Sequence, residues 1–379
     1  MFLTLPQLVL YGIIAQFLFL ILLCVVLKGR RPLPRLLLAV MLTGMTGTLL
    51  EVFLHTTGFV LRYPETAFTG TILGMLQPGA IFLYAQSVMY RDFRLRLRHF
   101  AHLLPVLGAA AVFVVGYYRL STEEQVSVLS DSRYPGVMNS VVLAIALHTI
   151  MLAYLAATLK KISRFGVELR QIFSDLDNKE LGWLRNLLLA YTTAWALSLV
   201  YCLLAHILRV TGSHEWLTIA TTGVSIAILL PMSVLAFQQP ALFAGIRPAS
   251  ASKDAAPRIS TAGQPPEPPT EQIRQLMEEQ RPYLHSNLTV DRLARLAGLS
   301  PRDLSQFLNQ QMGRNFYEFV NGYRIEHARQ RLADLTEKAT ITDIMYESGF
   351  NSKSVFNTLF RETTGKTPSQ YRRSFRNNG

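Results

Sequence analysis

Long apolar runs and short polar connections alternate over the first 243 residues. A bilayer-spanning helix needs about 20 predominantly apolar residues, and seven runs are long enough. We predict spans near residues 7–27, 33–54, 68–90, 99–118, 137–159, 183–208 and 216–238. The pattern therefore predicts a seven-helix transmembrane domain over residues 1–243. After residue 270 the pattern changes to short amphipathic helices, which predicts an all-α chain with a second, soluble domain.

Basic residues in the connections predict how the spans are oriented. The connections after spans 1, 3 and 5, together with the starts of the spans that follow them, carry 14 Lys and Arg, whereas the connections after spans 2, 4 and 6 carry 4. Such an excess marks the cytoplasmic side. The first run has no basic segment before it and Lys-Gly-Arg-Arg after it, which is the reverse of a cleaved signal peptide. We therefore predict an outer N-terminus, seven spans and a cytoplasmic C-terminus in a multi-pass protein of the bacterial cytoplasmic membrane.

Composition agrees with a membrane part and a soluble part. Hydrophobic residues make up 50% of the 379 residues and charged residues only 16%, against about 25% in an average soluble domain. These values argue against a soluble enzyme and against a disordered chain. With only Cys24 and Cys202, a disulfide scaffold is excluded. The net charge of +12 divides into +8 over residues 1–270 and +4 over residues 271–379.

Polar residues inside or at the ends of the predicted spans form one candidate site. Ionisable groups within a bilayer are costly and are often functional. They admit two interpretations: interfacial groups or hydrogen-bond partners between helices, and an outward-facing sensory pocket for a small-molecule or envelope signal. The candidate ligand-sensing residues are Glu51, His55, Gln77, His148, Tyr201 and His206.

The connection after the fifth predicted span is itself amphipathic. Over residues 163–182, Phe165, Leu169, Ile172, Phe173 and Leu176 share one helical face, and the opposite face is charged. One interpretation is a helix lying on the cytoplasmic membrane surface. The other is a dimer or signal-relay contact with the C-terminal domain.

Residues 244–270 form a linker rich in Pro, Ala and Ser. The segment holds six prolines and shows no hydrophobic period, which is typical of a partly extended, disordered tether. As a flexible coil its 27 residues would reach roughly 30 Å. Such a linker argues against a rigid helix carrying a signal to the C-terminal domain and favours control through dimer proximity.

The C-terminal domain, residues 271–379, contains the same pattern twice. Residues 288–313 predict helix, turn, helix, with Gly298 in the turn. Ser300 starts the second helix as a Ser-x-x-Asp cap that is followed by proline. Residues 342–363 predict a second such pair, and residues 315–334 a long helix between them. About 20 helical residues span 30 Å, close to the 34 Å of one DNA turn. Two recognition helices could therefore enter neighbouring major grooves.

Residues 271–376 resemble the AraC/XylS family of bacterial transcription regulators. The resemblance is carried by LARLAGLS and RDLSQFL, by GRNFYEFVNGYRIEHARQRL, and above all by GFNSKSVFNTLFRETTGKTPSQYR. It implies two helix-turn-helix units that read a bipartite DNA site. There are two departures. Met345 stands where members often have Ala, and Gln306 stands where Arg is common, so a shared guanine contact is not carried over to that position. The membrane part, through residues 78–105, is more distantly similar to sensor domains fused to such regulators.

The outer faces of the second helix of each pair provide the candidate DNA contacts. Arg, Asn and Gln on such a face can hydrogen-bond to base edges, and the resemblance implies base-facing roles for most of these positions. The candidate DNA-binding residues are Arg302, Ser305, Gln306, Asn309, Lys353, Ser354, Asn357, Thr358 and Arg361. The modest charge of this domain indicates that affinity rests on individually placed Arg and Lys contacts.

Together these patterns predict a membrane-bound one-component transcription regulator rather than an enzyme. The sequence holds no Gly-rich phosphate loop, no metal-binding spacing of His or Cys and no nucleophile elbow, so we expect no cofactor and no metal. The expected partners are double-stranded promoter DNA, the lipid bilayer, RNA polymerase and a second copy of the chain. Two alternatives are a transporter or channel with a regulatory cytoplasmic domain, and a membrane enzyme acting on lipid.

Overall fold

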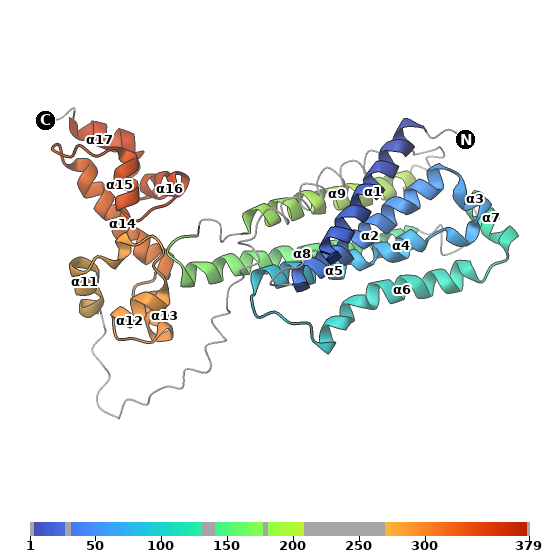
Figure 1. The fold of residues 1–379 in the computed structure, drawn as a ribbon, viewed down its shortest axis with the longest axis horizontal. Coiled ribbons are helices and arrows are strands. Elements are labelled where there is room, and N and C mark those ends of the chain that lie inside the picture. The colour runs from blue at the N-terminus through green and yellow to red at the C-terminus, as the bar shows by residue number, and fades with distance from the viewer. Residues whose placement is uncertain (1–3, 27–31, 131–140, 177–180, 208–269, 377–379) are drawn as a thin grey trace, which may run out of the picture. The chain divides into compact units, whose positions relative to one another are not determined.

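The computed structural model describes residues 4–26, 32–130, 141–176, 181–207 and 270–376 (Figure 1). Within these ranges every named element is helical. The chain divides into two compact units, which are described separately. Unit 1 comprises Met1–Ile162 and Gly182–Asp254, and unit 2 comprises Ser163–Leu181 and Ala255–Gly379. The predicted all-helical class is confirmed for the described residues.

Unit 1 contains the long apolar helices. Six stretches of the described residues are long and apolar enough to cross a membrane, and each coincides with a predicted span. The seventh predicted span, 216–238, lies outside the described residues, as does the predicted linker, 244–270, except for Thr270, which is the first residue of a helix. The helices are α1 (Leu5–Val26), α2 (Pro32–Thr56), α3 (Phe59–Arg62), α4 (Thr69–Gly74), α5 (Leu76–Met89), α6 (Leu104–Phe113), α7 (Thr122–Ser130), α8 (Val141–Ile172) and α9 (Gly182–Ile207).

Two of the predicted spans are less regular than single helices. The third is divided between α4 and α5, with Met75 between them. The fourth begins with a 3₁₀ helix, Leu97–Leu103, continues as α6 and ends in a π-helical turn, Val114–Tyr118. Pro105 lies at the start of α6, where its missing N–H costs nothing.

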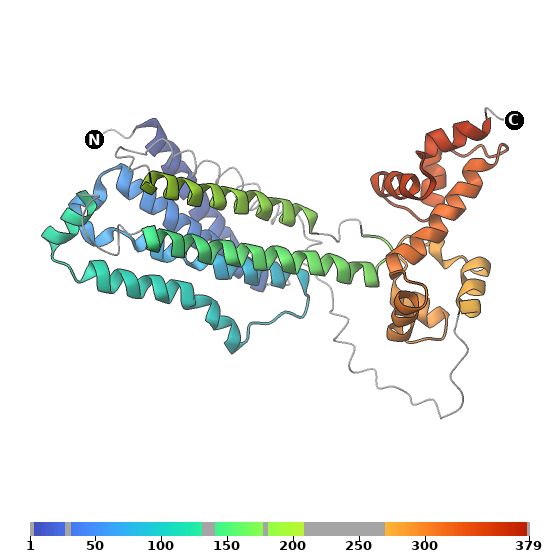
Figure 2. The same cartoon turned by 180° about the vertical axis from the view of Figure 1, so that it is seen from behind.

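Glycines allow α2 and α4 to approach closely. A Cβ atom added at Gly70 would overlap the carbonyl oxygen of Gly47, and one added at Gly47 would lie 2.6 Å from Leu73. Figures 1 and 2 show α2, α4 and α5 running side by side. Small residues at such crossings are typical of helix packing in membranes, where close backbone approach replaces the hydrophobic driving force.

The α8 helix continues beyond the fifth predicted span. It runs without interruption from Val141 to Ile172 and so includes the first half of the amphipathic connection. The part from Ser163 onward belongs to unit 2, together with the residues that follow it up to Leu181. The sequence pattern predicted a separate helix there. The face it identified is real, since Phe165 and Leu169 are buried and Ile172 packs against a core of unit 2.

Unit 2 is built along one central helix, α14 (Phe316–Ala333). The N-terminal half of α14 contributes Phe316, Phe319 and Val320 to one hydrophobic core, and its C-terminal half contributes Ile325, Ala328 and Leu332 to a second. Figures 1 and 2 show α12 and α13 near one end of α14 and α15 to α17 near the other. The remaining helices are α11 (Thr270–Glu279), α12 (Val290–Leu296), α13 (Pro301–Gln310), α15 (Ile341–Glu347), α16 (Lys353–Thr364) and α17 (Pro368–Arg376).

Candidate nucleic-acid interface

The first helix pair, α12 and α13, has the predicted turn and cap. Gly298 takes φ of +66°, a left-handed conformation that suits glycine. The hydroxyl of Ser300 accepts a hydrogen bond from the Asp303 N–H at 3.1 Å and donates to the Asp303 carboxylate at 2.6 Å. Pro301 occupies the first helical position. These interactions satisfy the helix start and fix the direction of α13.

The second pair, α15 and α16, repeats this local chemistry. Thr340 and Asp343 form a reciprocal capping box at the start of α15. The hydroxyl of Ser352 accepts from the Val355 N–H at 3.4 Å and caps α16. Gly349 in the turn has φ of +87°, and an added Cβ atom would lie 2.6 Å from the Tyr283 carbonyl oxygen. Only glycine fits this turn without strain.

The candidate DNA-binding residues all lie on the outer sides of α13 and α16. Ser305 and Asn357 are half-buried and the other seven are exposed. The inner sides are buried, with Leu304, Phe307 and Leu308 on α13 and Phe356 and Phe360 on α16. Each second helix thus presents polar groups to solvent while its apolar side is held in a core.

A buried arginine lies where the two cores meet on α14. Arg324 is only 1% exposed, although its guanidinium is charged. Its Nε donates to the Tyr283 carbonyl at 2.7 Å, and its Nη2 donates to the His285 carbonyl at 2.8 Å. It also lies over the Phe350 ring of the second core at 5.8 Å. Arg324 therefore connects the loop before α12 to the turn between α15 and α16.

The sequence analysis missed Arg324, although a signal was present. Val320, Arg324 and Ala328 are spaced by four residues along the buried stripe of α14, so a charge at the middle position must be buried. Desolvation lowers the pKa of Arg324 below its usual value, and the nearby Asp175 carboxylate opposes that shift. Asn321, one turn earlier, is also buried and accepts from Arg324 at 3.1 Å.

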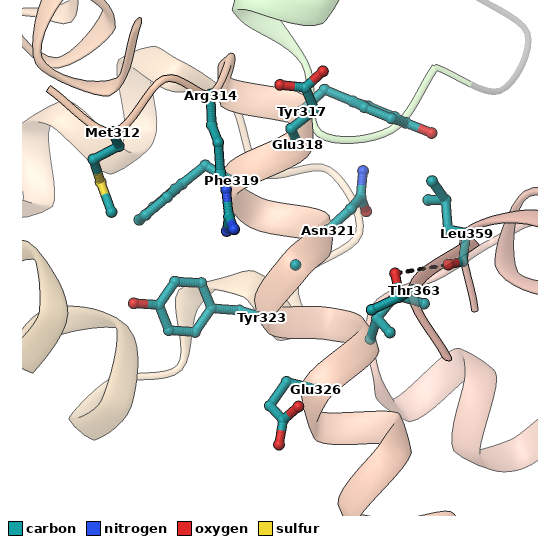
Figure 3. Close-up of a pocket in the computed structure, with 12 residues that line it drawn as sticks. Met312, Arg314, Tyr317, Glu318, Phe319, Asn321, Tyr323, Glu326, Leu359 and Thr363 are labelled. Atoms are coloured by element: carbon teal, nitrogen blue, oxygen red, sulfur yellow. Dashed lines mark hydrogen bonds between the residues drawn. The ribbon is translucent and has the colours of Figure 1, made fainter. Parts of the chain in front are cut away.

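A cavity of about 490 Å³ opens beside α14 between the two helix pairs (Figure 3). Met312 and Arg314 line it from the end of the first pair, and Leu359 and Thr363 from α16. Figure 3 shows these two sets of side chains on opposite sides of α14. The space between the second helices is therefore a groove with mixed polar and apolar walls.

In unit 1 the described candidate sensing residues do not converge on one place, and at least four of them have specific partners, namely Glu51, His55, Gln77 and His148. The buried Glu51 carboxylate accepts from the N–H groups of Phe68 and Gly70 at 2.7 and 2.9 Å, and His55 Nε2 lies 3.1 Å from it. Glu51 belongs to α2, and these bonds hold its carboxylate against the start of α4.

The other sensing candidates lie on neighbouring helices. The Gln77 side chain donates to the Thr48 hydroxyl at 3.2 Å and accepts from the Tyr191 hydroxyl at 2.7 Å. His148 Nε2 lies 3.2 Å from the Ser198 hydroxyl. Tyr201 is half-buried on α9, and the side chain of His206 lies outside the described residues. The geometry matches interhelical hydrogen bonding at Glu51, Gln77 and His148, and a sensory role of the six residues stays a prediction.

No group of His, Cys, Asp and Glu within the described residues could hold a metal ion. Of the two cysteines, Cys24 is buried and Cys202 half-buried, and both are free thiols.

Comparison with known proteins places the C-terminal part among helix-turn-helix proteins. A family model described as a helix-turn-helix domain matches residues 293–374, which begin within α12 and include α13, α14, α15 and α16. An uncharacterized HTH-type transcriptional regulator of Staphylococcus aureus (strain COL) is 34% identical over 102 residues. The alignment covers 27% of this chain and 13% of that protein.

Two further matches each cover about a quarter of this chain. The HTH-type transcriptional regulator GlxA of Rhizobium meliloti (strain 1021) is 31% identical over 98 residues, which is 26% of this chain and 30% of that protein. Among solved structures, the C-terminal domain of AraT, a response regulator from Geobacillus stearothermophilus, is 30% identical with a TM-score of 0.26. That match covers 28% of this chain and 86% of the solved chain.

These similarities support DNA-binding transcription regulation by the C-terminal part, in agreement with the predicted AraC-type resemblance. Regulators of this kind are generally not enzymes. The chain spans 13% and 30% of the length of these two curated relatives.

Proposed function

We propose that this chain is a membrane-bound one-component transcription regulator. The spacing of the two helix pairs on α14 is the observation that carries the proposal. α14 has 18 residues and is therefore about 27 Å long, near the 34 Å between successive major-groove faces of a duplex. As two helix-turn-helix units, the pairs would read two half-sites on one face of the DNA.

Six of the candidate DNA-binding residues of α13 and α16 divide by chemistry into two groups. We call residues that bond to base edges readers and residues that bind the phosphate backbone anchors. Gln306, Asn309 and Asn357 carry amides that can bond to base edges, most favourably adenine. Arg302, Lys353 and Arg361 carry charges suited to phosphate, and we propose that they bind the DNA backbone. Because only the readers report sequence, their loss should relax specificity, whereas loss of an anchor should weaken binding to all sequences.

Unit 1 supplies the membrane part of the proposal. The six long apolar helices of the described residues and the predicted seventh span support seven spans, an outer N-terminus and a cytoplasmic DNA-binding domain. In this arrangement a small-molecule or envelope signal acts on unit 1, and the DNA-binding domain, alone or as a homodimer, recruits RNA polymerase.

A genome-wide map of DNA bound by the tagged full chain tests the proposal. We expect discrete sites containing two half-sites about one helical turn apart, recovered from the membrane fraction. Lys353→Ala should reduce occupancy at every site. Arg274→Ala is the matched control, since this exposed arginine of α11 already pairs with Glu271 and Glu278. A map without discrete sites, or equal effects of the two variants, would contradict the proposal.

A reporter fusion tests the predicted topology. Green fluorescent protein fused after residue 243 should fluoresce, because seven spans from an outer N-terminus place this point in the cytoplasm. Fusion after residue 130, between spans 4 and 5, should be dark, because the reporter does not mature outside the cytoplasm. The reverse pattern would contradict the predicted orientation.

A further inference from the structure

The residues that follow the apolar part of α8 are bound by the DNA-binding domain of the same chain. Ser174 is buried, and its carbonyl and hydroxyl oxygens accept hydrogen bonds from the two terminal nitrogens of Arg324, both at 3.0 Å. The Ser174 hydroxyl also donates to the Leu288 carbonyl at 2.7 Å. Phe173 forms an isolated antiparallel bridge with Thr289. We refer to Gln171–Asp175 as the docking segment.

The docking segment reaches one of the candidate base readers directly. The amides of Gln171 and Asn309 form two reciprocal hydrogen bonds, of 3.2 and 2.9 Å. Asn309 lies on the exposed side of α13. A side-chain amide that bonds to an adenine needs the same donor and acceptor pair. Gln171 therefore occupies the atoms of Asn309 that would face a base.

At the second helix pair the docking segment places a negative charge. The Asp175 carboxylate accepts from the Asn351 amide at 3.0 Å, two residues before the start of α16. The N-terminal residues of a recognition helix and its positive dipole end face the DNA in this class of domain. A carboxylate at that place repels phosphate and takes a donor that phosphate could use.

The docking segment also follows the groove between the two helix pairs. Ser174 and Asp175 line a narrow space with Tyr317 and Asn321, and these two α14 residues also line the larger cavity. In Figure 3 the green chain beside Tyr317 and Glu318 is this part of the protein. One face of the domain thus holds both the docking segment and the sides of α13 and α16 proposed to read DNA.

From these contacts we infer that the docking segment is an internal inhibitor, which must leave its groove before the domain can read its DNA site. The inference rests on the proposed function. Because α8 is one uninterrupted helix from Val141 to Ile172, a displacement of this helix in unit 1 moves Gln171 and the residues after it. Water can replace the exposed contacts of Gln171 and Asp175, and release also breaks the buried bonds between Ser174 and Arg324.

Equilibrium binding by the full chain in nanodiscs tests the inference. The probe is a duplex recovered in the genome-wide map, with a scrambled duplex for comparison. Gln171→Ala/Asp175→Ala removes the hydrogen bonds to Asn309 and Asn351 and leaves Ser174 and Arg324 in place. Removing one such hydrogen bond changes an equilibrium constant several-fold, so we expect the double variant to bind about tenfold tighter.

Two control variants distinguish release of the docking segment from the effect of a nearby substitution and from a change in net charge. Val167→Ala alters an exposed α8 residue that lies one turn before Gln171, and it should leave the Kd unchanged. Glu362→Gln removes an exposed negative charge from α16, and it measures how far a change in net charge alone strengthens binding. Equal tightening by Glu362→Gln and by the double variant would overturn the inference.

A covalent tether gives the opposite arm. Cysteines at 171 and 309, in a chain with Cys24→Ala and Cys202→Ala, are joined by a short bis-maleimide. The joined protein should bind the specific duplex at least about tenfold more weakly than the same protein before joining. An unchanged Kd would overturn the inference, as would weaker binding by the Gln171→Ala/Asp175→Ala variant. If no form binds any duplex, the proposed function fails with it, whereas intact wild-type binding with no response to release or tethering rejects the inference alone.

Discussion

Glu51 in unit 1 and Arg324 in unit 2 are both buried ionisable residues, but their hydrogen-bond partners come from different distances along the chain. Glu51 bonds to His55, Phe68 and Gly70, all within 19 residues. Arg324 bonds to carbonyl groups about 40 residues away and to Ser174, 150 residues away. A charge satisfied by its neighbours stays satisfied whenever the local fold is present. A charge satisfied by a remote segment is sensitive to where that segment lies.

The two sites share one packing feature. Each has a glycine against the charged side chain: a Cβ atom at Gly70 would lie 2.7 Å from Glu51 Cβ, and one at Gly349 would lie 3.0 Å from Arg324 Nε. In both places the backbone approaches the charge so closely that no side chain fits. The difference between the sites therefore lies in the origin of the partners and not in the tightness of packing.

The largest effect is expected from Arg324→Ala. The substitution leaves the buried Tyr283 carbonyl without a donor and removes one of the two donors to the Ser174 carbonyl, which should cost about 3 kcal/mol or more. Hydrogen exchange of the full chain should show reduced protection over residues 316–350. Arg329→Ala, on the same helix with an exposed Glu326 partner, should cost less than about 0.5 kcal/mol. Equal protection in the two variants would show that the Arg324 network contributes little.

The next largest effect is expected from Gly349→Ala. It introduces a side chain at φ of +87° and a clash with the Tyr283 carbonyl, for a cost of about 2–3 kcal/mol. Gly365→Ala is the matched control, because Gly365 has φ of +74° but open space around it, so its cost should be about 1 kcal/mol. Urea-dependent hydrogen exchange of unit 2 measures both. Similar costs would mean that conformation alone, without the close approach, requires the glycine.

In unit 1, Glu51→Gln should have a smaller effect. The amide keeps one acceptor, so one of the two bonds to the start of α4 is weakened, at about 1 kcal/mol. The amides of Phe68 and Gly70 should exchange faster in nanodiscs, whereas the exposed control Glu65→Gln should leave them unchanged. If Glu51→Gln and His55→Ala both leave the transcriptional response intact, the sensory hypothesis for this pair is wrong.

The smallest effect concerns pH. His327 is half-buried, and its Nδ1 lies 3.1 Å from the Ser348 hydroxyl. Its pKa is lowered mainly by desolvation and, to a smaller extent, by the positive charge of Arg331. The unfolded state therefore binds the proton first, so stability is complete above the ordinary pKa of about 6.5 and is lost as pH falls below it. His327→Gln should remove this decline near pH 6 in hydrogen exchange of residues 316–350. A decline that persists in the variant would assign it to other groups.

Local signals in the sequence were sufficient for much of unit 2. The Ser300 cap and the Gly298 turn each depend on neighbours within a few residues, and the structure confirms them. The exposed positions of α13 and α16 followed from helical periodicity, although their role in DNA binding is still a prediction. In unit 1 the six long apolar helices of the described residues followed from hydropathy in the same way, and their place in a membrane is still a prediction.

The pairing of Ser174 with Arg324 could not be predicted in this way. Two polar residues 150 positions apart share no periodicity that would link them in the sequence. The proline-rich linker predicted a loose connection between the domains and no specific contact. The amphipathic pattern of residues 163–182 was visible, but the same pattern suits a membrane surface and a protein groove. Only the buried contacts of Ile172 and Ser174 favour the groove.

The connection through α8 also determines how the proposed inhibition would depend on the number of protein copies in a cell. The docking segment and its groove belong to one polypeptide, so their encounter is intramolecular and its effective concentration is set by the chain and not by expression level. The fraction of molecules held in the docked state would be the same in a cell with few copies as in one with many. A threshold built in this way would depend on the strength of the signal and would be insensitive to noise in gene dosage.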